Sequence, residues 1–156
     1  MDNATARVGL AHKDSRRENV FAALDLVRQE VVAKLGRQVM LKPNFLSSKN
    51  QLASTHVDAI RGAIDFLQTV PQPPAEIIVA EGGNEDYSGQ AFENFGYQAL
   101  VDECPVALRL VDLNQEESWQ ETTIFMIDGR EVPVRIPTLV LECPCTISVA
   151  VAKTHD

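Results

Sequence analysis

The chain has 156 residues, which fits one domain, and its 45% hydrophobic and 23% charged residues are typical of a soluble globular protein. Its net charge of -8 argues against nucleic acid and anionic membranes as partners, because phosphate binding requires a basic surface. The chain shows neither a secretion leader nor an apolar run as long as a membrane span, and its three cysteines are too few for a disulfide framework, so we expect a cytoplasmic protein.

The first half of the chain reads as strand, helix, strand, helix. Residues 7–12 (RVGLAH) form a short apolar run, and helical spacing follows over residues 15–36, starting at a Ser-x-x-Glu capping box. Residues 38–44 (QVMLKPN) predict a buried strand that a proline closes. A second helix starts at Thr55 and ends at the prolines of residues 71–74.

The second half continues the alternation and adds a hairpin. Residues 76–81 (EIIVAE) predict a third strand, and a glycine-containing loop leads into a third helix. Residues 107–114 (ALRLVDLN) predict a fourth strand. Over residues 122–137 an Asp-Gly pair separates two alternating runs, which is typical of a hairpin with a two-residue turn. Residues 145–154 (CTISVAVAKT) predict a last buried strand.

The order of these elements predicts an α/β fold. We expect a Rossmann-like layered fold with a mostly parallel sheet, helices on both faces and one β-hairpin. Ligands of such sheets bind beyond the carboxyl ends of the strands, and every parallel strand here ends in polar residues. These are His12 and Lys13, Lys42 and Asn44, Glu81 and Gly82, Asp112 and Asn114, and Lys153, Thr154 and His155. We expect one cleft surrounded by Lys42, Asn44, Glu81, Asp112, Lys153 and His155; the alternative is that strands simply end in polar loops.

A series of motifs between about residues 38 and 155 resembles one family. VMLKPN, STHVDAIRGAIDFL, IIVAEGG, AFENFGYQAL, LVDLN and LECPCTISVAVAKTH are similar in order and spacing to the domain of unknown function 362 family. Some iron–sulfur proteins contain this domain, and it has no general assigned activity. The family usually reads Pro-Lys-Leu-Lys where this chain has residues 150–153, and it continues past the final histidine. The resemblance implies that residues 1–156 are a single α/β domain, the N-terminal portion of a longer family domain.

The strand ends supply the candidate site residues. Lys42, Lys153 and His155 are the candidate catalytic residues, with the lysines holding an anion and His155 or His56 transferring protons. A lysine in a central strand is costly to bury, so either anion binding or pairing with Glu81 would explain Lys42. The candidate substrate-binding residues are Asn44, Thr55, His56, Glu81, Gly82, Asp112 and Thr154.

Four of these residues are candidate metal ligands. The nitrogen and oxygen atoms of His56, Glu81, Asp112 and His155 suit a divalent transition metal such as zinc, iron, nickel or manganese. None lies at a known ligand spacing, so only the convergence of strand ends supports the metal. For His56 the alternative is an exposed histidine beside a helix start that Thr55 caps.

Two other features argue against particular cofactors. The glycine loop after the third strand matches no nucleotide-binding motif, and Glu81, Glu85 and Asp86 would repel phosphate. Cys143 and Cys145 have no second cysteine pair and no ferredoxin-type run beside them. We therefore expect structural cysteines and no iron–sulfur cluster within this chain.

Two functions remain from the sequence. One is a portion of an enzyme that binds a small polar or anionic substrate, with a metal or a redox partner as candidate additions. The other is a non-catalytic ligand-binding or protein-interaction domain. A chain that stops at Asp156 is also expected to leave apolar surface uncovered and to self-associate.

Overall fold

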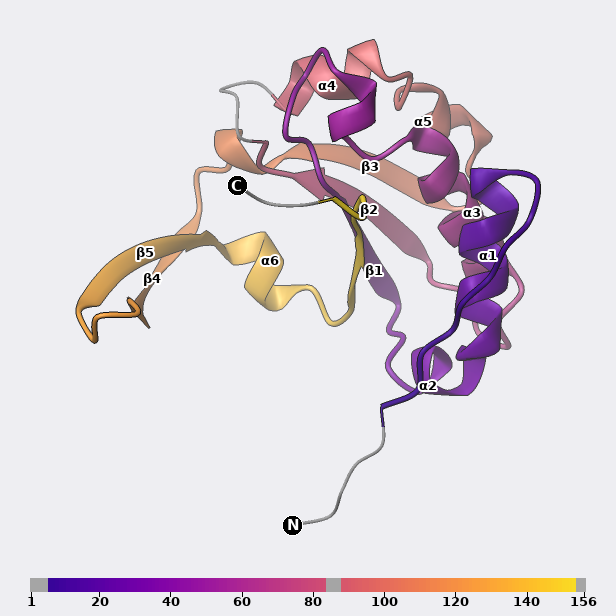
Figure 1. Cartoon of the computed structure of the whole chain (residues 1–156), viewed down its shortest axis with the longest axis horizontal. Coiled ribbons are helices and arrows are strands. Elements are labelled where there is room, and N and C mark those ends of the chain that lie inside the picture. Colours follow the sequence, from indigo (N-terminus) through magenta and orange to yellow (C-terminus); the bar gives the residue numbers. More distant parts are fainter. Residues whose placement is uncertain (1–5, 84–87, 154–156) are drawn as a thin grey trace.

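The computed structural model describes residues 6–83 and 88–153, and its centre is a four-stranded parallel sheet (Figure 1). The strands are β1 (Gln38–Pro43), β2 (Glu76–Glu81), β3 (Ala107–Asp112) and β6 (Thr146–Val149), in the order β3-β2-β1-β6. The helices are α1 (Arg16–Leu26), α2 (Arg28–Val32), α3 (Val57–Gln68), α4 (Ser88–Asn94), α5 (Ala99–Glu103) and α6 (Thr138–Glu142), with short 3-10 segments at Gln51–Ala53 and Leu113–Gln115.

The two faces of the sheet are covered unequally. Alternate residues of β1 point to opposite faces, so Leu41 packs in the core beneath α3, whereas Met40 lies in a smaller cluster with Ile78. Leu139 and Val140 of α6 pack against that smaller cluster. The sheet is buried on both sides, which explains why its central strands read as continuous apolar runs. The predicted α/β class with helices on both faces is confirmed.

The prediction of a strand at residues 7–12 is wrong. In the structure this segment is extended but pairs with no described strand, and Val8 and Leu10 are exposed. β1 already has β2 and β6 as its two neighbours, so no position beside it is free. The segment lies against α1 instead, so closely that a Cβ atom on Gly9 would fall 2.4 Å from the carbonyl oxygen of Ala23. His12 and Lys13 consequently do not follow a strand of the sheet.

The hairpin consists of β4 (Trp119–Phe125) and β5 (Glu131–Pro137), which form a separate antiparallel sheet that extends away from the main one (Figure 1). The two-residue turn is a wrong prediction. The Met126 amide donates to the Arg130 carbonyl at 2.8 Å, which leaves three residues in the loop, and Gly129 takes the left-handed conformation at φ +82°. This is the three-residue hairpin loop in which glycine is favoured at the last position.

None of the helices within residues 6–83 and 88–153 is long and apolar enough to cross a bilayer.

The contact between α1 and α3 depends on a glycine. A Cβ atom on Gly62 would lie 2.3 Å from the Arg17 carbonyl oxygen and 3.1 Å from Val20 Cβ. We expect Gly62→Ala to destabilise the domain by about 1–3 kcal/mol, because overpacking outweighs the gain in helix propensity. Urea unfolding checks this against Gly89→Ala in α4, where the new methyl would meet nothing nearer than 3.9 Å. Equal stabilities for the two variants would contradict the close packing.

Candidate functional site

An ion pair between a buried carboxylate and a partly exposed lysine lies at the carboxyl ends of β1 and β2. Lys42 Nζ donates to Glu81 Oε2, and Glu81 Oε1 accepts a hydrogen bond of 3.2 Å from the Phe45 amide. Glu81 is only 3% exposed, whereas the side chain of Lys42 is 38% exposed. The carboxylate is therefore satisfied by two donors, and the ammonium still reaches the edge of the sheet. Of the two explanations for a lysine in this strand, pairing with Glu81 is confirmed.

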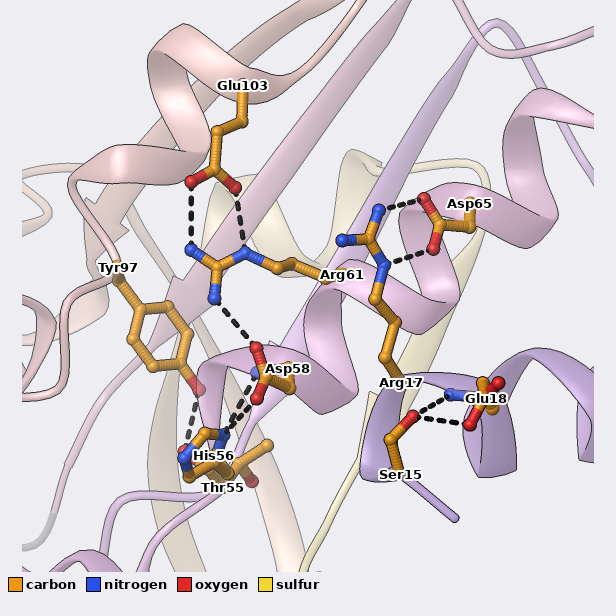
Figure 2. Close-up of polar contacts among 10 residues, drawn as sticks. All are labelled: Ser15, Arg17, Glu18, Thr55, His56, Asp58, Arg61, Asp65, Tyr97 and Glu103. Atoms are coloured by element: carbon orange, nitrogen blue, oxygen red, sulfur yellow. Dashed lines mark hydrogen bonds and ion pairs between the residues drawn. The ribbon is translucent and has the colours of Figure 1, made fainter. Parts of the chain in front are cut away.

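Thr55 ties the loop after β1 to the end of β6. Its hydroxyl donates to the Val149 carbonyl at 2.7 Å and accepts from the Asn44 amide at 2.9 Å. Its own carbonyl accepts a bond of 2.8 Å from the hydroxyl of Tyr97 (Figure 2). Burial, with a smaller contribution from the charge of Glu81, raises the pKa of Tyr97, so the phenol stays protonated and acts as a donor. These bonds connect Thr55 to Asn44 just after β1, to the end of β6 and to Tyr97.

His56, rather than Thr55, caps α3. Its Nδ1 atom accepts a hydrogen bond of 3.1 Å from the Asp58 amide. The hydroxyl of Thr55 is unavailable for capping because it bonds to β6, so the alternative in which Thr55 caps the helix is wrong. In the neutral ring, an accepting Nδ1 leaves the proton on Nε2. The side chain is 32% exposed, and it thus offers a donor to a ligand at this edge.

A chain of charged side chains extends from His56 through Asp58 and Arg61 to Glu103. Asp58 Oδ2 lies 3.4 Å from His56 Nδ1, and Asp58 Oδ1 accepts from Arg61 at 2.8 Å (Figure 2). Arg61 also donates twice to Glu103, at 2.7 and 3.0 Å. The hydrogen bonds to Glu103, and then the one to Asp58, raise the pKa of Arg61, and the hydrogen bonds from Arg61 lower the pKa of Glu103. These contacts fix the Asp58 carboxylate beside the His56 ring.

A pocket of about 240 Å³ opens beside His56, between the start of α3 and the segment that follows β6. Arg16, the first residue of α1, lies on one wall, and Ala150 and Val151 lie on another. Within the described part of the chain, Arg16 forms no ion pair, although most other arginines there do. The pocket is lined by Arg16, Gln51, Leu52, Ser54, Thr55, His56, Ala59, Ala150 and Val151.

Comparison with protein families bears on this same region. The model of the domain of unknown function DUF362 matches residues 39–156 of the chain. The chain belongs to this family. No curated protein and no solved structure gives a significant match. The DUF362 match includes His56 and the segment after β6 but begins after Arg16, so the pocket combines the family region with a helix outside it.

At the end of the sheet edge formed by β2 and β3, the polar side chains form hydrogen bonds within the fold. Asp112 Oδ1 accepts from the Asn114 amide at 3.0 Å, and Oδ2 accepts from the Gly89 amide at 3.2 Å. Asn114 in turn donates to the Gly83 carbonyl at 3.0 Å, and a Cβ atom on Gly82 would lie 3.0 Å from its Oδ1. In the structure of this DUF362 chain, Asp112 therefore joins the ends of β2 and β3 to α4.

The predicted catalytic and metal residues are only partly within the described chain. Lys153 is exposed, two residues beyond the pocket wall, whereas Thr154 and His155 lie outside the described residues. Among residues 6–83 and 88–153, no three histidine, cysteine or acidic side chains come together as metal ligands. His56, Glu81 and Asp112 are therefore not grouped as ligands, and the four-residue metal set stays a prediction because His155 lies outside the described residues.

All three cysteines are free thiols. Cys143 Sγ donates to the Cys145 carbonyl at 3.4 Å, and Cys143 also packs beside α6 on the smaller core cluster. Burial raises the pKa of Cys104 and of Cys145, which keeps both thiols protonated and unreactive. These features agree with structural cysteines.

Sequence reasoning did not include Arg16 in the site. One signal was present, because acidic residues are favoured in the first turn of a helix and this helix begins with two arginines. Arg17 is explained by its ion pair with Asp65, at 2.7 Å in one contact, but Arg16 has no such partner. Only the docking of α1 against α3 places Arg16 beside His56.

Proposed function

We propose that this domain binds a small carboxylate-containing ligand in the pocket between α3 and the end of β6. The observation that carries the proposal is Arg16, a guanidinium without an ion-pair partner in the described chain, on the same pocket as His56. On a chain of net charge -8, an uncompensated cation beside a cavity favours an anion. Guanidinium binds carboxylate through two parallel hydrogen bonds.

The remaining walls indicate the size and character of the ligand. Leu52, Ala59 and Val151 supply apolar surface to the pocket lining. A volume of about 240 Å³ suits a molecule of a few heavy atoms rather than a nucleotide. The ligand class that fits is a short-chain carboxylic acid, with its charged end toward Arg16 and its apolar body along the other wall.

We further propose that this domain is a portion of an enzyme, in which proton transfer follows ligand binding. In this version the His56 ring would carry a proton on both nitrogens, with Nδ1–H toward Asp58 Oδ2, and would transfer the Nε2 proton to the bound molecule, which leaves the ring neutral. Lys42 and Lys153 would hold further negative charge, and His155 would act as a second proton-transfer group. A divalent metal at His56, Glu81, Asp112 and His155, and a redox partner, belong to this version only.

The competing function is a non-catalytic ligand-binding or protein-interaction domain. It would use the same pocket without proton transfer, and it is favoured by the exposed hairpin described below. The two versions differ in whether His56 changes the bound molecule or only contacts it.

NMR titration of the ¹⁵N-labelled protein with propanoate tests the binding step. We expect amide shifts at Gln51, Ala59 and Val151, and at least about tenfold weaker binding in Arg16→Ala, because a hydrogen bond to a charged group contributes about 1.5–3 kcal/mol. Arg37→Ala is the matched control, since Arg37 lies on a different pocket and has no ion pair in the described chain. Binding that is equal in both variants, or absent, would refute the proposal.

A further inference from the structure

The β4–β5 hairpin exposes an open strand edge, and this feature is independent of the pocket. Every residue of β4 is exposed, including Trp119, Ile124 and Phe125, the last with 73% of its surface accessible. Within the described chain, β4 pairs only with β5. A two-stranded hairpin alone is marginally stable, so this one gains from any further strand that joins it.

The hydrogen-bond pattern shows which backbone groups face outward. At the two ends of the ladder, Met126 donates to Arg130 at 2.8 Å and Thr138 donates to Ser118 at 2.9 Å. Hydrogen-bonded and non-hydrogen-bonded pairs alternate between these ends. The outward groups of β4 therefore belong to its odd-numbered residues, which are Trp119, Glu121, Thr123 and Phe125.

The two edges of the hairpin differ in their protection. By the same alternation, the outward positions of β5 are Glu131, Pro133, Arg135 and Pro137. Two of these four are prolines, which have no amide to donate and so block the addition of a strand. β4 has no proline, and its four outward positions all carry an amide. Strand addition is blocked on one edge and open on the other.

We propose that β4 pairs with β4 of a second copy of this chain, antiparallel about a twofold axis through Thr122, to make a four-stranded intermolecular sheet. In this register Trp119 forms a hydrogen-bonded pair with the second copy's Phe125, and Glu121 does so with the second copy's Thr123. Both pairs occur twice, because the twofold axis repeats every contact between the two copies. Outward-facing residues meet outward-facing residues throughout, as antiparallel pairing requires.

The sequence of β4 suits a second copy in this register better than in its neighbours. Two aromatic pairs form, and the single charged residue, Glu121, opposes threonine. Shifting the axis by one residue toward the amino end would place Glu121 against Glu121, and like charges directly opposite each other are destabilising. Shifting it toward the carboxyl end would separate Trp119 from Phe125. The strand is thus complementary to itself at one register.

Sedimentation velocity on the full chain tests the proposal, over roughly 10 µM to 1 mM protein, the range in which small interfaces associate. We expect a dimer whose population rises with concentration. Thr123→Pro removes an outward amide without breaking the β4–β5 ladder and should weaken the dimer at least about tenfold. Glu131→Pro makes the same change on β5, the blocked edge, and should leave the dimer unchanged. Circular dichroism confirms that both variants are folded.

Charge substitutions test the register with opposite signs. Thr123→Lys places an ammonium opposite the second copy's Glu121 twice per dimer and should tighten association about three- to tenfold. Thr123→Glu should weaken it by a similar factor. A protein that is monomeric throughout the concentration range would overturn the proposal, as would a dimer that Thr123→Pro leaves intact. A dimer with the same response to lysine and glutamate would overturn the register.

Discussion

Replacing Lys42 with methionine is expected to destabilise the domain by about 3–5 kcal/mol, because it leaves the buried Glu81 carboxylate without its counter-charge. Methionine preserves the length and apolar stem of the side chain, so little packing is lost. The Phe45 amide remains as a donor to Glu81, but one backbone hydrogen bond does not compensate a charge that is 3% exposed. Urea unfolding at neutral pH measures the effect.

Two comparisons separate the charge from the side chain. Lys42→Met combined with Glu81→Gln should recover most of the loss, since a neutral amide still accepts from Phe45 and has no charge to satisfy. Lys49→Met removes an exposed lysine with no ion pair in the described chain and should change stability by less than about 0.5 kcal/mol. If Lys42→Met were as mild as Lys49→Met, Glu81 would not depend on Lys42.

Much of the sheet could be predicted from local sequence. The apolar runs of β1 and β2 are buried on both faces, and this burial is what makes such runs continuous rather than alternating. Residues 7–12 show the limit of that reasoning. This run is apolar without being buried, because Val8 and Leu10 are exposed and only Gly9 lies close to α1, at Ala23. The order of the strands, moreover, depends on long-range pairing that no local pattern contains.

The candidate site was predictable to the extent that it depends on strand ends. Parallel strands end at one edge, so Lys42 and Glu81 were expected to be neighbours, and they are bonded. The partners of Asp112 were not predictable, because they are backbone amides whose positions follow from loop geometry. Arg16 was missed for a related reason. It reaches the edge through helix packing rather than through a strand.

Replacing Thr55 with valine is expected to cost about 2–4 kcal/mol, because two buried backbone groups lose their partner at once. The hydroxyl accepts from the Asn44 amide and donates to the Val149 carbonyl, and Thr55 is only 2% exposed. Valine has the same shape, so the loss arises from the unsatisfied groups and not from a cavity. Chemical denaturation of the purified variant measures it.

The same substitution connects the stability of the fold to the proposed pocket. Thr55 holds the end of β6 against the start of α3, and the pocket beside His56 is lined by α3 and by the segment after β6. Thr55→Val should therefore also weaken propanoate binding, whereas Thr55→Ser, which keeps the hydroxyl, should restore both stability and binding. Thr69→Val is the matched control. Its hydroxyl bonds to Phe66 and Arg28 at an exposed helix end, so water replaces the lost partner and the cost stays below about 1 kcal/mol. If Thr55→Val cost no more than Thr69→Val, the bond to β6 would not be what holds the pocket walls together.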